Sequence, residues 1–287
     1  MALGPASLVF CSPPLAHVPL LDRIGAVAAA GFDALSLQPG DIWALEAQGM
    51  TAAEIAARIA DAGLQVAEMD CAAHWMGRHD TAACSVPDLG DLLRGLTARR
   101  VVETAARIGA RSVAAIDLSA TPAALEEAAE GFAGLCDLAD EHGLKAHIEF
   151  LPVSAIRTLG EAWAIIAAAG RDNGGLTIDA WHLFRSGSTL AELAAIPGER
   201  IHTVQLCDAP AAPGGDLWAE LMGGRLLPGE GELDLAGLVR TLDAIGSTAP
   251  IGVEVFHARQ AEQSPEEVAR AWAGTTRALL AQARGPA

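Results

Sequence analysis

Short runs of hydrophobic and β-branched residues recur along the chain, separated by longer segments in which apolar positions follow a helical period. The runs read SLVFCS, DALSLQ, LQVAEM, RSVAAIDL, KAHIEF, LTIDAW, HTVQLC and IGVEVF. Each run predicts a buried strand, and each intervening segment predicts a helix. Eight strands that alternate with eight helices predict an α/β protein with the (β/α)8 TIM-barrel architecture.

Capping residues mark the predicted helix boundaries. Three helices begin with the spacing of a capping box, at Thr51, Thr158 and Ser264. A fourth is predicted to start at Thr121-Pro122, with proline at the first helical position. Glycine closes the alanine-rich helices before the next strand, at Gly31, Gly63, Gly143, Gly170 and Gly246.

The alternative α/β architecture is a doubly wound open sheet, which usually binds a nucleotide at a glycine-rich turn after its first strand. Here that turn reads CSPPLAHV and has no glycine fingerprint. The length of 287 residues exceeds the usual domain size of about 150 residues, but α/β barrels commonly reach about 250. We therefore expect a single TIM-barrel domain over residues 1–287.

Composition and charge narrow the classes of partner. The formal net charge is −17 and the sequence pI is near 4.7, which opposes binding to the phosphate backbone of nucleic acids. Prolines interrupt the N-terminal apolar stretch, so we expect neither a signal peptide nor a membrane span. The chain has five cysteines and no CxxC pair, which is typical of free thiols in a reducing cytoplasm. We therefore expect a cytoplasmic protein with no nucleic-acid or membrane partner.

The last four predicted strands each end near a polar residue with apolar neighbours: Glu149, Asp179, Gln205 and Glu254. In a TIM barrel such positions meet at the face that carries active sites. Three carboxylates facing one interior need compensation, since like charges disfavour ionisation. A divalent cation would provide it, and carboxylate and amide oxygens suit Mg or Mn, with Co or Zn as alternatives. The competing interpretation is four separate core residues, each satisfied by hydrogen bonds.

Arg225 is the candidate for anchoring a substrate. It lies in GGRLLPGEGELDL, a glycine-flanked segment after the seventh strand. A guanidinium there suits a hydroxyl, carboxylate or phosphate group of a ligand. The alternative is an ion pair with Glu230 or Asp208.

Other polar residues lie in predicted loops. The stretch APAAPGGD, residues 209–216, predicts a long functional loop. His74 and His79 follow the third strand, where they either line the pocket or lie in a solvated loop. Arg185 either pairs with an acidic neighbour, which we expect, or reaches the substrate.

The segments HIEFLP, TIDAWHLFRSG, VQLCDA, RLLPGEGELDL and GVEVF, in this order, resemble the xylose isomerase-like TIM-barrel superfamily. The closer match is its sugar phosphate isomerase/epimerase-like branch. The resemblance covers essentially the whole chain, and its specific part is Ala146 to Phe256. That branch binds one divalent metal ion, and the resemblance places the ligands on Glu149, Asp179, Gln205 and Glu254. Its Asp-x-x-His pattern falls on Asp179 and His182, which implies that His182 reaches the substrate or a metal-bound water.

The resemblance implies proton abstraction next to a carbonyl group. In such sites the metal bridges the carbonyl and a neighbouring hydroxyl and stabilises the enediolate. By resemblance, Glu149 and Glu254 are both ligands and the acid/base pair. Return of the proton epimerises or isomerises a keto sugar or related polyol. Loss of a β-hydroxyl instead dehydrates a cyclic hydroxy-ketone such as 3-dehydroshikimate or an inosose.

Gln205 bears on the choice between these reactions. Many epimerases of the branch have histidine at this position, whereas dehydroshikimate dehydratases are similar to this chain in having glutamine. The overall match favours an isomerase or epimerase, and Gln205 favours a lyase. A sugar-binding barrel without catalysis is disfavoured because both candidate acid/base carboxylates are present. Barrels of this branch are often dimers or tetramers, so the resemblance is compatible with a homo-oligomer.

Overall fold

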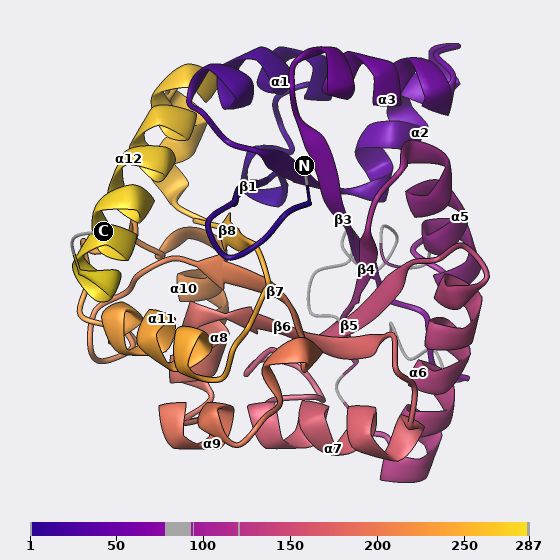
Figure 1. Ribbon diagram of the computed structural model, residues 1–287, viewed down its shortest axis with the longest axis vertical. Helices are drawn as coiled ribbons and strands as arrows, with labels where there is room; N and C mark the ends of the chain where they lie inside the picture. The colour runs from indigo at the N-terminus through magenta and orange to yellow at the C-terminus, as the bar shows by residue number, and fades with distance from the viewer. Residues whose placement is uncertain (1, 78–92, 94, 120, 286–287) are drawn as a thin grey trace.

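The computed structural model of the protein describes residues 2–77, 93, 95–119 and 121–285. Its eight strands form a closed barrel, in which each strand pairs in parallel with the next and β8 pairs with β1 (Figure 1). The predicted TIM barrel is therefore confirmed. The strands are β1 (Leu8–Cys11), β2 (Ala34–Leu37), β3 (Gln65–Ala72), β4 (Ser112–Ala115), β5 (Lys145–Glu149), β6 (Gly174–Asp179), β7 (Ile201–Leu206) and β8 (Ile251–Val253).

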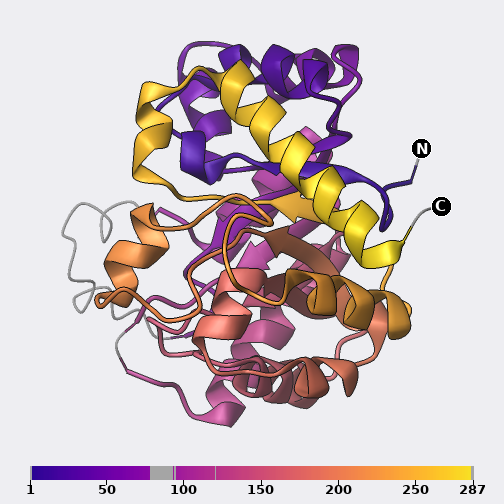
Figure 2. The same ribbon diagram turned by 90° about the vertical axis from the view of Figure 1, so that its left-hand side faces the viewer.

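Helices surround the barrel, and helical segments follow every strand (Figures 1 and 2). The longer ones are α1 (Leu20–Ala29), α3 (Ala52–Asp61), α5 (Ala98–Ile108), α6 (Leu125–Asp140), α7 (Leu159–Ala169), α11 (Leu235–Ala244) and α12 (Pro265–Arg284). Further helices that the hydrophobic pattern did not predict are α2 (Pro39–Ala47), α8 (Ala180–Arg185), α9 (Leu190–Ala194) and α10 (Leu217–Gly223). No helix within the described residues has both the length and the apolarity needed to cross a membrane.

Most predicted helix boundaries are confirmed. Full capping boxes form at Thr51, Thr158 and Ser264. All five predicted stop glycines have positive φ, between 63° and 80°. The predicted start at Pro122 is wrong, because α6 begins at Leu125 after an extended Ala124. The fixed φ of proline suits extended chain as well as a first helical turn, so proline permits a helix start without requiring one.

The apolar core lies mainly between the sheet and the helices. Phe10 of β1 stacks on Trp272 of α12 with their ring centroids 4.6 Å apart, and α12 is tied to the chain start where Arg284 donates to the Pro5 carbonyl. The described cysteines, Cys11, Cys71, Cys136 and Cys207, are buried free thiols. Cys84 and His79 lie outside the described residues.

The inside of the barrel is polar in its middle layer, where TIM barrels usually carry branched aliphatic residues. The His147 ring lies 2.6 Å from Thr177 Oγ1 and 3.0 Å from Ser112 Oγ. The Thr203 hydroxyl donates to Glu68 Oε2 at 2.7 Å, and the same oxygen is 3.4 Å from His147 Nε2. His147 is thus a satisfied core histidine.

Candidate active site

The strand register places the four predicted polar residues on one rim of the barrel. Glu149 ends β5, and Asp179 ends β6, paired in register with Gln205 of β7. Gln205 pairs in turn with Gly252, two residues before Glu254. All four polar side chains are buried, with Glu149 the most exposed at 6%. The C-terminal ends of β5 to β8 therefore meet as the strand pattern predicted.

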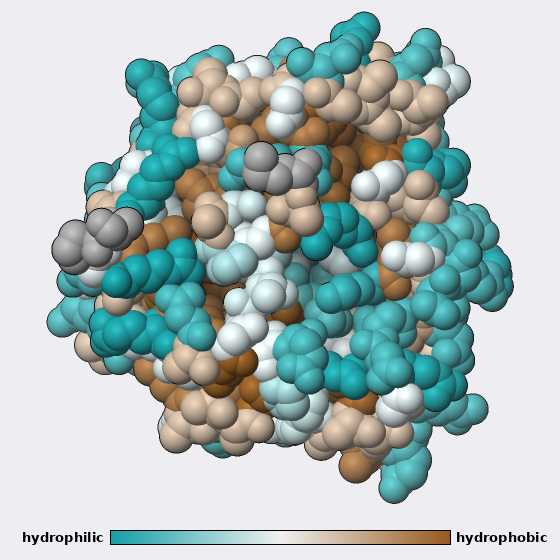
Figure 3. All heavy atoms as spheres, viewed as in Figure 1, coloured by the Kyte–Doolittle hydropathy of each residue, from teal (hydrophilic) through white to brown (hydrophobic). Residues whose placement is uncertain are grey.

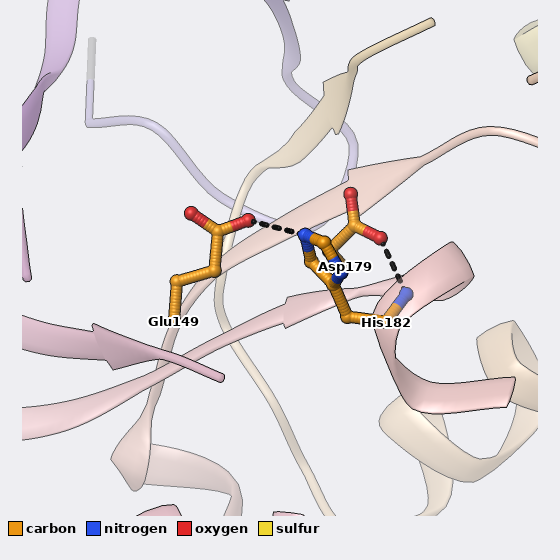
Figure 4. A group of neighbouring side chains, drawn as sticks. All are labelled: Glu149, Asp179 and His182. Carbon is orange, nitrogen blue, oxygen red and sulfur yellow. Dashed lines mark hydrogen bonds and ion pairs between the residues drawn. The ribbon is translucent and has the colours of Figure 1, made fainter. Parts of the chain in front are cut away.

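Three of the side chains around this rim form a candidate metal site. One oxygen from Glu149, one from Asp179 and one nitrogen of His182 lie within 4.8 Å of one another (Figure 4). Asp179 caps α8, and its Oδ1 accepts from the His182 backbone N–H at 2.8 Å. This turn carries the His182 ring toward Glu149, with Nε2 3.2 Å from Oε1. The three-residue spacing of Asp179 and His182 is therefore a helix cap that brings both side chains into one site.

Gln205 adds an unsatisfied acceptor. Its Oε1 is buried, as is the Nδ1 of His182, and neither atom has a hydrogen-bond partner among the described residues. An unpaired buried polar atom costs about 1–3 kcal/mol, so a ligand for Gln205 Oε1 would stabilise the site. Carboxylate oxygens, an amide oxygen and an imidazole nitrogen suit a divalent ion. The residues present therefore fit a metal.

Arg225 lies within the carboxylate cluster. Its Nη1 is 2.9 Å from Asp179 Oδ2 and 3.3 Å from Glu254 Oε2, and the side chain is 1% exposed. No ion pair forms with Glu230 or Asp208 in the described part of the chain, so the alternative interpretation of Arg225 is wrong. The guanidinium supplies part of the charge compensation that the sequence suggested a metal would provide.

Asp208 instead fixes the Pro-Gly-Glu-Gly segment that follows Arg225. Its Oδ1 accepts from the backbone N–H groups of Ala209 and Leu233, and its Oδ2 accepts from that of Gly229. A Cβ at Gly231 would lie 2.4 Å from Asp208 Oδ1 and 2.5 Å from the Ala209 carbonyl oxygen. Glycine is required at position 231 because the backbone approaches so closely.

Burial sets the protonation behaviour of the cluster. It raises the pKa of Glu149 to about 8, with Asp179 adding to the rise and Arg225 opposing it. Burial also raises the pKa of Glu254 well above its ordinary value, against the effect of Arg225. The pKa of His182 is lowered to about 4, first by burial. A carboxyl group that titrates near neutral pH is suited to general acid–base chemistry.

The cluster opens into a cavity of about 200 Å³ at the C-terminal face. Glu149, His182, Arg225 and Glu254 line its polar side. Much of the remaining lining is apolar and includes Leu93, Leu96, Ile116, Leu118, Leu151, Leu221, Met222 and Phe256. The cavity therefore offers both reactive polar groups and hydrocarbon to a ligand.

Asp70 is a polar residue of this cavity that the sequence interpretation missed. It lies in β3 and lines the same space. Its pKa is raised well above the ordinary value by burial, and then by Glu149 and Glu68. Its signal in the sequence is a carboxylate directly after the LQVAEM run, at the end of the third strand, whereas the predicted site residues come from the last four strands.

Glu220 connects the elements beside the cavity through hydrogen bonds. Its Oε1 accepts from Trp181 Nε1 at 2.9 Å and from Arg185 Nε at 2.7 Å. The predicted acidic partner of Arg185 is therefore confirmed. The predicted loop 209–216 joins β7 to α10, and Gly214 N–H donates to Glu220 Oε2. These bonds join α8, α10 and the loop into one wall.

Comparison with known proteins agrees with this architecture. The sequence model of the family described as xylose isomerase-like TIM barrel matches residues 24–276. Inosose isomerase of Bacillus licheniformis is 31% identical over 183 residues, which cover 61% of this chain and 65% of that protein. 3-Dehydroshikimate dehydratase of Pseudomonas aeruginosa is 29% identical over 245 residues, which cover 83% of this chain and 36% of that protein.

A solved structure of IolI protein with a bound zinc atom superposes with a TM-score of 0.83 at 21% identity, covering 96% of this chain and 98% of that one. At this identity the likeness shows the fold. The match to the isomerase spans slightly less than two thirds of that relative's length. The family model, in contrast, covers most of this chain. The chain therefore belongs to the xylose isomerase-like TIM barrel family.

Proposed function

We propose that the protein is a divalent-metal-dependent isomerase or epimerase that moves a proton next to the carbonyl group of a keto sugar or cyclic polyol. The observation that carries this proposal is the convergence of Glu149, Asp179 and His182 at a cavity that Glu254 and Arg225 also line. The similarity to an inosose isomerase supports the reaction class.

The proposed metal ligands are Glu149, Asp179, Gln205 and Glu254, with His182 as a further nitrogen donor. A bound ion would polarise the substrate carbonyl and stabilise the negative charge that develops on its oxygen. Oxygen ligands favour Mn or Mg, whereas the imidazole nitrogen makes Co and Zn suitable too. The zinc atom in the IolI structure is in keeping with this range.

Four side chains have proposed roles in proton transfer and substrate binding. Glu149 and Glu254 are the proposed acid and base, since burial raises both of their pKa values toward the range in which a carboxyl group can exchange protons at neutral pH. Arg225 is the proposed substrate anchor. Its side chain lines the cavity, where the guanidinium would donate to a substrate hydroxyl. His182 is the proposed contact to the substrate or the metal.

The cavity favours a cyclic, unphosphorylated substrate. Its apolar lining residues suit the C–H groups of a ring, and its polar lining residues suit the hydroxyl and carbonyl groups. Among the described lining residues Arg225 is the one guanidinium or ammonium group, and it already pairs with Asp179 and Glu254. A phosphate would therefore find little free positive charge there.

A dehydratase of a cyclic hydroxy-ketone is the second candidate. Gln205 at the ligand position favours it, and so does the similarity to a 3-dehydroshikimate dehydratase over 83% of this chain. Both reactions begin with proton abstraction next to a carbonyl group and differ in whether a β-hydroxyl then leaves. The same proposed metal ligands would suit either reaction.

The test is to incubate the Mn-loaded protein with ketoses, an inosose and 3-dehydroshikimate in deuterated water. Deuterium in the recovered sugar or inosose supports an isomerase or epimerase, and new absorbance of a conjugated enone supports a dehydratase. A chelator should abolish turnover, and added metal should restore it. Tight sugar binding with no turnover of any substrate would contradict both candidates.

Glu149→Gln and Glu254→Gln should each lower kcat by about 10²–10⁴-fold, the usual contribution of a general acid or base. Glu266→Gln, on the exposed first turn of α12, removes the same charge away from the cavity and is the matched control. Equal activity of all three variants would refute the assigned roles.

A further inference from the structure

A second cavity, of about 370 Å³, lies at the opposite end of the barrel, where the strands begin. Residues at the starts of β4, β5 and β7 line it, together with Leu3 from the beginning of the chain. Figure 3 views this face directly, and hydrophilic side chains border the hollow near its centre. In Figure 2 the same face is on the right, away from α10 and the active site.

The cavity is lined by cationic groups without acidic partners. Arg111 and Lys145 both line it, and no aspartate or glutamate is among the described lining residues. Both side chains are exposed, and neither is in an ion pair within the part of the chain that the structure describes. Partial burial lowers the pKa of Lys145, and the nearby Arg111 and Arg200 lower it further. These cations therefore repel one another in a protein whose formal net charge is −17.

His202 provides a buried donor at the same place. Its side chain is 8% exposed, and neither ring nitrogen has a partner at normal hydrogen-bond geometry among the described residues, although the backbone of Asn173 and Ile201 lies beside the ring. A Cβ at Gly175 would lie 2.5 Å from His202 Nε2, so the absence of a side chain at Gly175 makes room for the ring. Burial and then Lys145 lower the pKa of His202 to about 4, against the backbone groups of Asn173 and Ile201, which raise it. At neutral pH the ring is uncharged and offers one N–H.

We propose that this cavity binds a small oxyanion, a phosphate or a carboxylate, between Arg111, Lys145 and His202. A guanidinium, an ammonium and an imidazole N–H together provide charge-assisted donors for several oxygens of such a ligand. Its negative charge would relieve the repulsion between the cations. Lys145 and His202 belong to β5 and β7, and Arg111 directly precedes β4, so the ligand links the starts of three strands, two of which carry Glu149 and Gln205 near their other ends. The site is independent of the proposed reaction.

The test is thermal unfolding of the full-length, metal-loaded protein in increasing phosphate or acetate, with ionic strength held constant by sodium chloride. A ligand at about 100 times its Kd should raise the Tm by about 5 °C, and the rise should saturate. The anion with the lower Kd identifies the natural chemistry as phosphate or carboxylate. A response no larger than that to chloride alone would overturn the proposal.

A pair of double variants assigns the response to this cavity. Arg111→Gln with Lys145→Gln should weaken binding at least tenfold. Arg58→Gln with Arg240→Gln removes the same charge from exposed positions on α3 and α11 and should respond like the wild type. Any anion binding at the active-site metal is common to both double variants. Equal responses from the two would show that the anion binds elsewhere and would overturn the assignment.

Discussion

The ion pairs of Arg225 allow the charge balance of the candidate active site to be tested directly. Its Nη1 lies 2.9 Å from Asp179 and 3.3 Å from Glu254, and all three side chains are buried. Arg225→Met retains an apolar stem but leaves two carboxylates without their cation. Removing one partner of a buried pair costs about 3–5 kcal/mol. We expect a loss of this size in the free energy of unfolding when divalent metal is absent.

Divalent metal should recover part of this loss. A bound cation neutralises the same carboxylates, and removal of the neighbouring guanidinium removes a charge that opposes metal binding. Arg225→Met should therefore bind Mn more tightly than the wild type. A ligand that binds only the folded state raises the free energy of unfolding by RT ln(1 + [L]/Kd). Tenfold tighter binding of Mn therefore adds about 1.4 kcal/mol of stabilisation.

The measurement is urea-induced unfolding followed by circular dichroism at pH 7, with EDTA and with excess Mn. Arg107→Met is the control, because Arg107 forms an exposed ion pair with Glu46 at 3.0 Å. Exposed pairs contribute about 0–1 kcal/mol, so this variant should stay close to the wild type in both conditions. The reasoning is refuted if the free energy of unfolding of Arg225→Met in EDTA is within about 1 kcal/mol of the wild-type value. It is also refuted if Mn stabilises Arg225→Met and the wild type equally.

Two further predictions concern the barrel interior and the loop after Arg225. Burial raises the pKa of the Glu68 carboxyl group. The folded protein therefore keeps a proton on Glu68 that the unfolded chain releases near pH 4.3. The free energy of unfolding should fall as the pH rises above about 4.3. Glu68→Gln should lessen this fall in urea unfolding between pH 5 and 8, and an unchanged pH dependence would contradict it. Gly231→Ala should lower the free energy of unfolding by about 1–3 kcal/mol and raise KM, because the new Cβ would clash with Asp208 and Ala209. Gly214→Ala, with no atom within 4 Å of the new Cβ, is the control, and equal Tm values for the two variants would argue against the steric reason.

The sequence by itself determined the barrel and much of the rim. Alternating apolar runs and helical segments encode eight strands and the helices that follow them, because hydrophobic period and capping are local properties of the chain. Glu149, Asp179, Gln205 and Glu254 were found because parallel strands all point their C-terminal ends to one face. Pro122 was misplaced because proline's backbone geometry suits more than one local structure.

Only the tertiary structure decided which side chains from distant segments meet. It gave Arg225 its partners on β6 and after β8, brought Asp70 into the cavity, and placed His182 beside Glu149. It also gathered Arg111, Lys145 and His202 at the far mouth of the barrel. Such contacts depend on strand register and on the closure of β8 against β1, neither of which leaves a local pattern in the sequence.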